Sequence, residues 1–292
     1  MHTSNPPPCV GEITERTPTG PSTVLLVGSG AVCGAWDPVV EAVQSVFGQV
    51  SHPDQANTAL GNVVSNLRFW YHAQVQELES EGEIRHTTKN TFCAWYATLE
   101  RLRVAIAESI ARAETSQTYV LRDEFEAVWN LAVRTSGSFR LLTTNWDRLI
   151  SNRIRTEWPE LEDTVFHVHG DRRDPTTLLL PAEAAFEPYR KPDARRTVQA
   201  RHRSVMQALE RADRLVLYGV SLSTDNSELA HAVALGLDES TIQQVEIIDS
   251  RPERAARRLM AMLQKCRPSL TGRTPDQLAP PASYVWRPYV IS

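Results

Sequence analysis

Short apolar runs alternate with helical patterns along most of the chain, and each run ends at glycine or at a polar cluster. The runs are residues 23–27, 139–143, 164–168, 214–218 and 245–248, with residues 178–180 as a shorter candidate. Short apolar runs bounded by turn signals predict buried strands. Strands that alternate with helices predict an α/β fold, here a Rossmann-like parallel sheet.

A long stretch without strand signals separates the first two predicted strands. Apolar residues recur there at helical spacing in three series, which predicts three helices over about residues 55–135. We therefore expect an inserted helical lobe within one domain that covers residues 23–266. Residues 1–22 are expected to form a flexible arm. Residues 267–292 are expected to form a Pro-rich tail, with a candidate edge strand at residues 284–286.

Glycine or polar clusters follow five of the predicted strands. They are Gly28-Ser29-Gly30-Ala31, Thr144-Asn145-Trp146-Asp147, His169-Gly170-Asp171, Gly219-Val220-Ser221-Leu222 and Asp249. In an open parallel sheet, ligands bind beyond the carboxyl ends of the strands. The sequence therefore predicts one site that gathers these clusters.

The glycine turn and the last cluster each have a second, structural explanation. Gly28 and Gly30 suit a phosphate-binding turn, but they also suit any tight turn from strand to helix. The dinucleotide fingerprint would place a third glycine where this chain has Cys33. Asp249 can accept hydrogen bonds from a ribose or cap the helix that follows it.

The amide, carboxylate and histidine candidates also have structural alternatives that the sequence does not decide. Asn145 and Asp147 can project into a cleft, or one of them can cap the next helix. His169 competes with His167, which lies on the same face of a regular strand. A bend at Gly170 would favour His169, and the sequence does not show whether the chain bends there.

Taken together, these clusters resemble the sirtuin-like superfamily, especially its bacterial members that hydrolyse NAD in antiphage defence. Gly28-Ser29-Gly30 matches the Gly-Ala-Gly loop, Thr144–Asp147 the Thr/Gln-Asn-x-Asp motif, and His169-Gly170 the His-Gly motif. Gly219–Leu222 matches the Gly-Thr/Tyr-Ser-Leu segment, and Asp249 falls where the family often has Asn. Order and spacing agree from about residue 23 to residue 249.

Two features of the sirtuin deacylases are missing. The four cysteines, Cys9, Cys33, Cys93 and Cys266, form no Cys-x-x-Cys pair, so we expect neither a zinc module nor a disulfide framework. The deacylase loop Ser-Gly-Ile-Pro-x-Phe-Arg is replaced by residues 33–38, Cys-Gly-Ala-Trp-Asp-Pro. Both features help deacylases grip an acyl-lysine peptide. The resemblance therefore implies NAD hydrolysis rather than deacylation.

The activity implied by the resemblance is a metal-independent NAD glycohydrolase that releases nicotinamide and ADP-ribose, with a cyclic product as a minor alternative. Asn145 would orient the ribose hydroxyls or the attacking water, and His169 would act as the general base. The implied NAD-binding residues are Gly28, Ser29, Gly30 and Ala31 at the pyrophosphate, Asp147 at the carboxamide, Thr144 in the same motif, and Gly219, Ser221 and Asp249 at the adenine end.

Two other functions stay open. A protein deacylase or ADP-ribosyltransferase could use the same pocket, and dependence of nicotinamide release on an acyl-lysine peptide would reveal it. A sensing module could bind NAD or ADP-ribose without turnover. The presence of both Asn145 and His169 argues against a sensor, because a sensor needs no base.

Charge and composition change this picture only at the margins. The formal net charge of −4 excludes a chain that binds polyanions as a whole. The basic stretches at residues 190–203 and 251–258 fit solvated helix faces, or contact with a nucleic acid or an acidic partner. The sequence has no membrane-length apolar run and no signal-peptide pattern at its N-terminus, so we expect a cytoplasmic protein.

A free NAD hydrolase would be toxic to its own cell. We therefore expect gating by homo-oligomerisation or by a regulatory partner that senses infection, with nucleic acid acting only through such a partner. The candidate assembly surface is the aromatic set Phe69, Trp70, Tyr71, Trp95 and Tyr96. The alternative is that these aromatic residues pack the core of the lobe itself.

Overall fold

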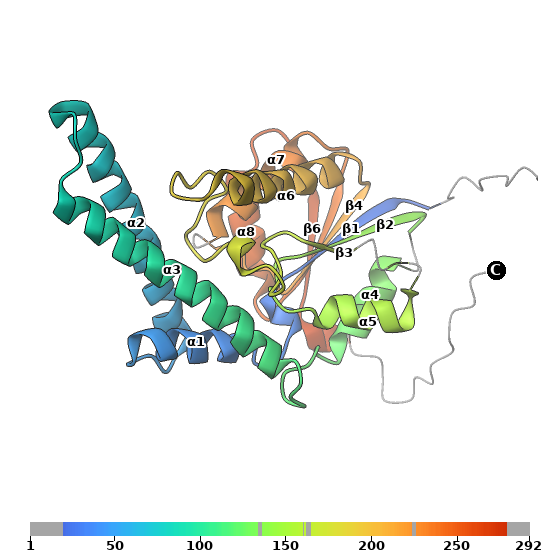
Figure 1. Ribbon diagram of the computed structural model, residues 1–292. Coiled ribbons are helices and arrows are strands. Elements are labelled where there is room, and N and C mark those ends of the chain that lie inside the picture. Colours follow the sequence, from blue (N-terminus) through green and yellow to red (C-terminus); the bar gives the residue numbers. More distant parts are fainter. Residues whose placement is uncertain (1–19, 134–135, 160, 162–164, 224–225, 279–292) are drawn as a thin grey trace, which may run out of the picture.

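The computed structural model describes residues 20–133, 136–159, 161, 165–223 and 226–278. Within them, the chain forms one six-stranded sheet flanked by helices (Figure 1). All strand pairs are parallel, and the strand order is β3-β2-β1-β4-β5-β6. The predicted Rossmann-like α/β fold is therefore confirmed. The expected arm up to residue 22 lies almost entirely outside the described residues, and the candidate strand at residues 284–286 lies wholly outside them.

The first five strands coincide with apolar runs of the sequence. They are β1 (Ser22–Val27), β2 (Ser138–Thr143), β3 (Val165–His167), β4 (Arg214–Tyr218) and β5 (Gln244–Ile248). β1 pairs with β2 on one side and with β4 on the other. The strand order therefore reverses between β1 and β4, and ligands of doubly wound sheets bind at such a reversal.

Helices cover both faces of the sheet. They are α4 (Glu124–Val133), α5 (Leu149–Glu157), α6 (Pro192–Glu210), α7 (Ser227–Asp238) and α8 (Pro252–Met262). Leu26 and Leu217 share a core with α6, α7 and α8, whereas their neighbours Leu25 and Val216 share another with α4 and α5. Because side chains alternate between two buried faces, these strands appear in the sequence as continuous apolar runs.

A helical lobe made of α1 (Asp37–Phe47), α2 (Pro53–Glu81) and α3 (His86–Ala113) lies beside the sheet. In Figure 1, α2 and α3 form a long hairpin that projects away from the sheet. The hairpin turns at Gly82, whose φ of 77° ends α2 in the left-handed conformation. Within the described part of the chain, no helix combines the length and the apolar character needed to cross a membrane.

The helices that form the lobe are not the three that were expected over residues 55–135. The three helices exist, but α4 packs on the sheet through Phe125, Val128 and Trp129. Conversely, α1 packs against α2 and α3 through Val39 and Val43. Helical periodicity identifies the residues that share a face, but it does not identify the element packed against that face.

The aromatic set of the lobe is mostly used inside the protein. Tyr71, Trp95 and Tyr96 are partly buried against the core of the lobe. Phe69 is 63% exposed and contacts Trp70 edge to face. The packing alternative therefore describes three of these residues, while Phe69 lies on the surface.

Two local predictions need correction. Residues 178–180 form no strand, because Leu178 and Leu180 are buried in the lobe core while the Leu179 N–H donates to the His169 carbonyl at 2.9 Å. The region expected to be a tail contains a sixth strand, β6 (Ser269–Arg273), parallel to β5. Because β6 is a largely exposed edge strand, it needs no apolar run, and the sequence pattern did not indicate it.

Candidate functional site

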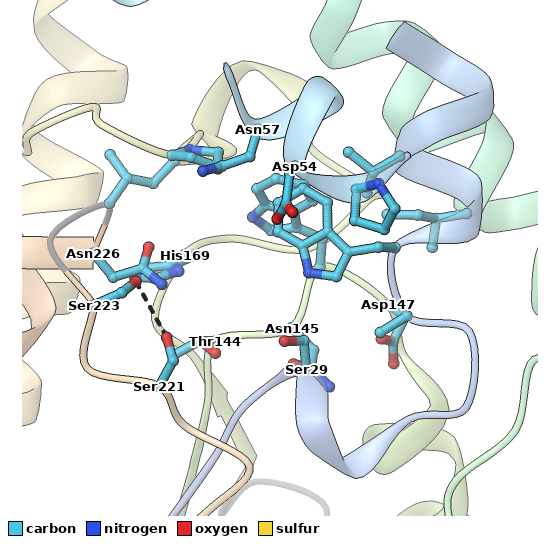
Figure 2. A pocket seen from close by; sticks show the side chains of 18 of the residues that line it. Ser29, Asp54, Asn57, Thr144, Asn145, Asp147, His169, Ser221, Ser223 and Asn226 are labelled. Atoms are coloured by element: carbon cyan, nitrogen blue, oxygen red, sulfur yellow. Dashed lines mark hydrogen bonds between the residues drawn. The ribbon is translucent and has the colours of Figure 1, made fainter. Parts of the chain in front are cut away.

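A cavity of about 420 Å³ lies beyond the carboxyl ends of the strands, between the sheet and the lobe (Figure 2). Small-molecule sites typically have volumes of roughly 300–1,000 Å³. The predicted site residues that line it are Ser29, Thr144, Asn145, Asp147, His169 and Ser221. Side chains from four separate segments of the chain thus meet in one place.

The glycines at the ends of β1 and β4 lie behind the cavity wall. A Cβ atom on Gly28 would lie 2.5 Å from the Gly219 carbonyl oxygen, and one on Gly30 would lie 2.6 Å from the Gly219 Cα. Gly219 itself has a φ of 62°, in the left-handed region that favours glycine. These glycines let two strand-end loops touch backbone to backbone, which fixes the floor of the cavity.

The pyrophosphate cradle expected over residues 28–31 is largely closed. Three of its amides donate to protein carbonyls at 2.9–3.1 Å: those of Gly28, Gly30 and Ala31. Ala31 is fully buried in the sheet core. From this segment, the described lining of the cavity includes Ser29 alone. The segment therefore offers a ligand one residue rather than a row of amides.

Asp249 is not among the described residues that line the cavity. Its Oδ1 accepts the backbone N–H of Arg251 at 2.8 Å, at the start of α8. The contact closes a local turn ahead of α8, whose N-cap residue is Arg251 and which has no side-chain cap hydrogen bond. Arg251 lines the cavity instead, so a cation lies where a carboxylate was expected.

Asn145 has a buried side chain without a protein partner. It is 6% exposed, and neither Oδ1 nor Nδ2 has a hydrogen-bond partner among the described residues. Its backbone is held firmly, because its N–H donates to Thr143 Oγ1 at 3.1 Å and its carbonyl oxygen lies 3.1 Å from His167 Nδ1. An unpaired buried polar group costs about 1–3 kcal/mol. A fixed, unpaired amide in a cavity indicates a group that binds a ligand.

Asp147 lies near Asn145 and is 3% exposed (Figure 2). Its Oδ2 accepts the Tyr119 hydroxyl at 3.1 Å, and its Oδ1 accepts the Leu149 N–H at 3.0 Å, which starts α5. Burial nevertheless raises the pKa of Asp147 to about 6. Burial, and then the nearby Asp147, also raise the pKa of Tyr119, so its hydroxyl stays a donor at neutral pH. A carboxyl group with a pKa close to neutrality therefore borders the cavity.

The turn after β3 decides between the two candidate histidines. His167 Nε2 lies 2.7 Å from the Ser151 hydroxyl on α5, and His167 is not among the described lining residues. Gly170 has a φ of 84°, and beyond β3 it is His169 that lines the cavity, as Figure 2 shows. A Cβ atom at position 170 would also lie 2.9 Å from the backbone carbonyl oxygen of Thr177, so the bend requires glycine.

His169 is neutral at physiological pH. It is 6% exposed, and burial, followed by nearby His202 and Arg201, lowers the pKa of His169 to about 3. A neutral imidazole carries a proton on one ring nitrogen and a free lone pair on the other. The ring of His202, on α6, lies 6.2 Å from that of His169 between centroids.

The lobe supplies a roof that the sequence did not predict. Its contributions to the lining are Trp36, Val39, Pro53, Asp54, Asn57 and Ile110. In Figure 2, Asp54 and Asn57 lie on the first turns of α2, across the cavity from Asn145. The start of α2 at Pro53 was visible in the sequence, since proline favours a first helical turn. No local pattern indicated that this helix start meets the strand ends.

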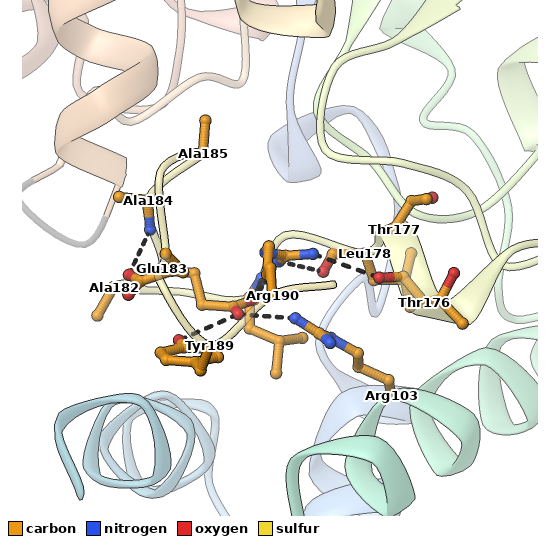
Figure 3. Close-up of polar contacts among 12 residues, drawn as sticks. Arg103, Thr176, Thr177, Leu178, Ala182, Glu183, Ala184, Ala185, Tyr189 and Arg190 are labelled. Atoms are coloured by element: carbon orange, nitrogen blue, oxygen red, sulfur yellow. Dashed lines mark hydrogen bonds and ion pairs between the residues drawn. The ribbon is translucent and has the colours of Figure 1, made fainter. Parts of the chain in front are cut away.

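A buried ion-pair cluster around Glu183 joins the lobe to the loop that follows His169 (Figure 3). Glu183 Oε1 accepts from Arg103 Nη2 at 2.7 Å and from the Tyr189 hydroxyl at 3.2 Å. Its Oε2 accepts from Arg190 Nη2 at 2.7 Å and from the Leu180 N–H at 2.9 Å. Burial opposes the charge, but Arg103 and Arg190 outweigh it and hold the pKa of Glu183 below its usual range. Because Arg103 belongs to α3, this cluster fastens the lobe.

Glu114, at the end of α3, makes a second connection. It accepts the Arg148 N–H at 2.7 Å through Oε1 and Arg172 Nη2 at 2.7 Å through Oε2. Arg148 directly follows Asp147, and Arg172 is three residues beyond His169. One carboxylate of the lobe therefore holds both loops that carry the candidate chemistry.

The basic stretch at residues 190–203 is partly internal. Arg190 is 4% exposed within the Glu183 cluster, and Arg201 Nη1 donates to the Thr177 carbonyl at 3.3 Å. Lys191, Arg196 and Arg203 are exposed, so they are the members left for solvent or a partner. Over the described residues, no grouping of His, Cys, Asp and Glu side chains could hold a metal ion.

No protein-family model matches the chain, and no curated protein matches its sequence.

Proposed function

We propose that this protein is an NAD glycohydrolase that cleaves the bond between nicotinamide and ribose. The observation that carries the proposal is the Asn145 side chain, which is buried in the cavity with both polar atoms unpaired. A ribose offers hydroxyl groups that can both donate to its oxygen and accept from its nitrogen. The resemblance of the strand-end motifs to the sirtuin-like superfamily suggests the same ligand.

The nicotinamide end of the substrate lies beside Asp147 in this proposal. The Asp147 carboxylate accepts from the carboxamide N–H and also balances the positive charge of the nicotinamide ring. Trp36 and Trp146 line the same cavity and provide aromatic surface for that ring. Cleavage passes through an oxocarbenium-like ribose, as in glycoside hydrolysis, and polar groups fixed before the reaction stabilise the developing charge.

His169 acts as the base towards a ribose hydroxyl or the attacking water. It is unprotonated at neutral pH, which is the form that a base requires. A positioned base contributes typically about 10²–10⁴-fold to the rate. The products are nicotinamide and ADP-ribose.

Arg251 and Ser221 serve the phosphate end. The amides of the glycine turn are mostly engaged within the protein. The Arg251 guanidinium lines the cavity and supplies the positive charge that a pyrophosphate needs.

We also propose, from the toxicity of free NAD hydrolysis, that the activity is gated by self-assembly or by a partner in antiphage defence.

The test is incubation of the purified protein with NAD, with nicotinamide and ADP-ribose followed by chromatography. Asn145→Ala and His169→Ala should each lower turnover by at least about 100-fold while the protein stays folded. Cys93→Ser, at an exposed position of the lobe, is the matched control and should keep wild-type turnover. Normal turnover by His169→Ala would show that the site is wrongly assigned.

One observation favours a binding protein as the second candidate. A histidine with a pKa of about 3 is a weak base, and a protein that only senses NAD needs no base. Calorimetric titration with NAD separates the candidates. Binding without turnover would favour a sensor or an enzyme that lacks its activator, and absence of binding would refute both candidate functions.

A further inference from the structure

His202 is a second buried histidine, with a ring nitrogen that no described group satisfies. Its Nδ1 lies 3.2 Å from the carbonyl oxygen of Val198, one turn earlier in α6, so the proton belongs on Nδ1. Its Nε2 is buried and has no partner among the described residues. His202 therefore presents a bare acceptor inside the protein, in a side chain that is 6% exposed.

This ring lies next to the candidate base. The centroids of His169 and His202 are 6.2 Å apart, and the ring planes are inclined at 42°. A contact of this length is bridged by one water or closed by a small rotation of either ring. The neighbouring Arg201 holds α6 against the same turn, because it donates to the Thr177 carbonyl at 3.3 Å and packs on Gly170.

A histidine that works as a base needs an acceptor behind it. The acceptor binds the ring N–H, so the other nitrogen faces the substrate with its lone pair. No hydrogen bond from the His169 ring to another described residue is present. We propose that His202 is a positioning residue, whose Nε2 accepts the back N–H of His169 directly or through one water. This inference rests on the proposed function, because it assigns a partner to the base of that reaction.

The proton balance is simple. The bond from ribose C1′ to the nicotinamide nitrogen breaks, and its electron pair leaves with neutral nicotinamide. As the oxygen of water or of a ribose hydroxyl bonds to C1′, its O–H bond breaks and the proton moves to the cavity-facing nitrogen of His169. The imidazolium that forms donates its other N–H to His202 Nε2, which stabilises the charge. The proton leaves His169 to solvent after the products depart, and no oxidant, reductant or metal takes part.

Two substitutions of His202, both of similar bulk, show whether this residue positions His169 or only fills space. His202→Phe fills the space without an acceptor, whereas His202→Gln retains a neutral acceptor oxygen. His202→Phe should lower kcat by about 10- to 100-fold with an unchanged KM for NAD, and His202→Gln should stay within about threefold of wild type. Should the phenylalanine variant fail to fold, His202→Leu replaces it. Wild-type kcat in the variant without an acceptor, or an equal loss in both variants, would overturn the proposal.

A second readout does not depend on turnover. Nitrogen-15 NMR of the histidine rings reports which nitrogen carries the proton. His169 should occupy one tautomer in the wild type and a mixture in His202→Phe, and an unchanged tautomer would refute the pairing. If the wild type neither binds NAD nor releases nicotinamide, the proposed function fails, and the ring spectra still decide whether the two histidines are paired.

Discussion

Two buried polar clusters in this protein have opposite hydrogen-bond states. The Glu183 carboxylate accepts four hydrogen bonds, and two of its donors are arginines that balance its charge. The Asn145 side chain, in the cavity, has no partner among the described residues, and burial raises the pKa of its neighbour Asp147 to about 6. Burying polar groups is tolerated when they are paired and destabilises the fold when they are not. We interpret the paired cluster as structural and the unpaired one as functional.

The largest effect should come from breaking the paired cluster. Glu183→Ala leaves Arg190 buried without a counter-charge, leaves Arg103 with Glu100 as its one remaining ion-pair partner among the described residues, and removes the acceptor of Tyr189. Loss of one partner from a buried ion pair typically destabilises by about 3–5 kcal/mol. Urea unfolding, followed by circular dichroism, measures this loss.

An exposed ion pair gives the matched control. Asp193 pairs with Arg196 at the surface of α6, with side chains that are 89% and 71% exposed. Exposed pairs contribute about 0–1 kcal/mol, so Asp193→Ala should have a small effect. If Glu183→Ala changed stability no more than Asp193→Ala does, the Glu183 cluster would not be what fastens the lobe.

The carboxyl group beside the unpaired amide, Asp147, should instead make the stability of the fold depend on pH. Folded Asp147 has a pKa of about 6, whereas an unfolded aspartate has one near about 4. The folded state therefore binds this proton more tightly, and stability falls as pH rises from about 4 to about 6, by on the order of 3 kcal/mol in total. Asp147→Asn should remove this fall, by roughly 1 kcal/mol over the accessible range from about pH 5 to pH 7.5.

The matched control for pH is a carboxylate at the cavity mouth. Asp54 also lines the cavity, but its side chain is 94% exposed. Asp54→Asn should leave the slope of stability against pH as it is in the wild type. Equal slopes for the wild type and Asp147→Asn would show that burial does not perturb Asp147.

The way in which a segment is buried determines how well its structure could be predicted from the sequence. Strands that are buried on both faces appear in the sequence as continuous apolar runs. The central strands and their parallel arrangement were therefore predictable. The edge strand β6 contains a single apolar residue, Leu270, and the pattern missed it. Residues 178–180 gave the opposite error, since the pattern predicted a strand that does not form. Their leucines are apolar because Leu178 and Leu180 are buried in the core of the lobe.

The candidate site was predictable where it follows the strands and not where it depends on the lobe. Asn145 stands two residues beyond the end of β2, and His169 stands two residues beyond the end of β3, so the strand-end rule brought them together. Asp54 and Asn57 reach the cavity only because the lobe folds over the sheet, and no local spacing encodes that contact. The choice of His169 over His167 depended on the left-handed turn at Gly170.

The smallest effect on stability is expected at Asn145 itself. Asn145→Ala deletes an amide that has no described partner, and its backbone contacts with Thr143 and His167 do not involve the side chain. Removing an unsatisfied buried group is nearly neutral or stabilising, so the free energy of unfolding should change by less than about 1 kcal/mol. Ser151→Ala is the paired comparison, because it leaves His167 Nε2 without its hydrogen-bond partner. It should lower the free energy of unfolding by about 1–3 kcal/mol. Adding NAD should then raise the unfolding midpoint of Ser151→Ala and leave that of Asn145→Ala unchanged. A destabilisation of Asn145→Ala as large as that of Ser151→Ala would mean that the Asn145 amide is structural, which would remove the contrast between the two clusters.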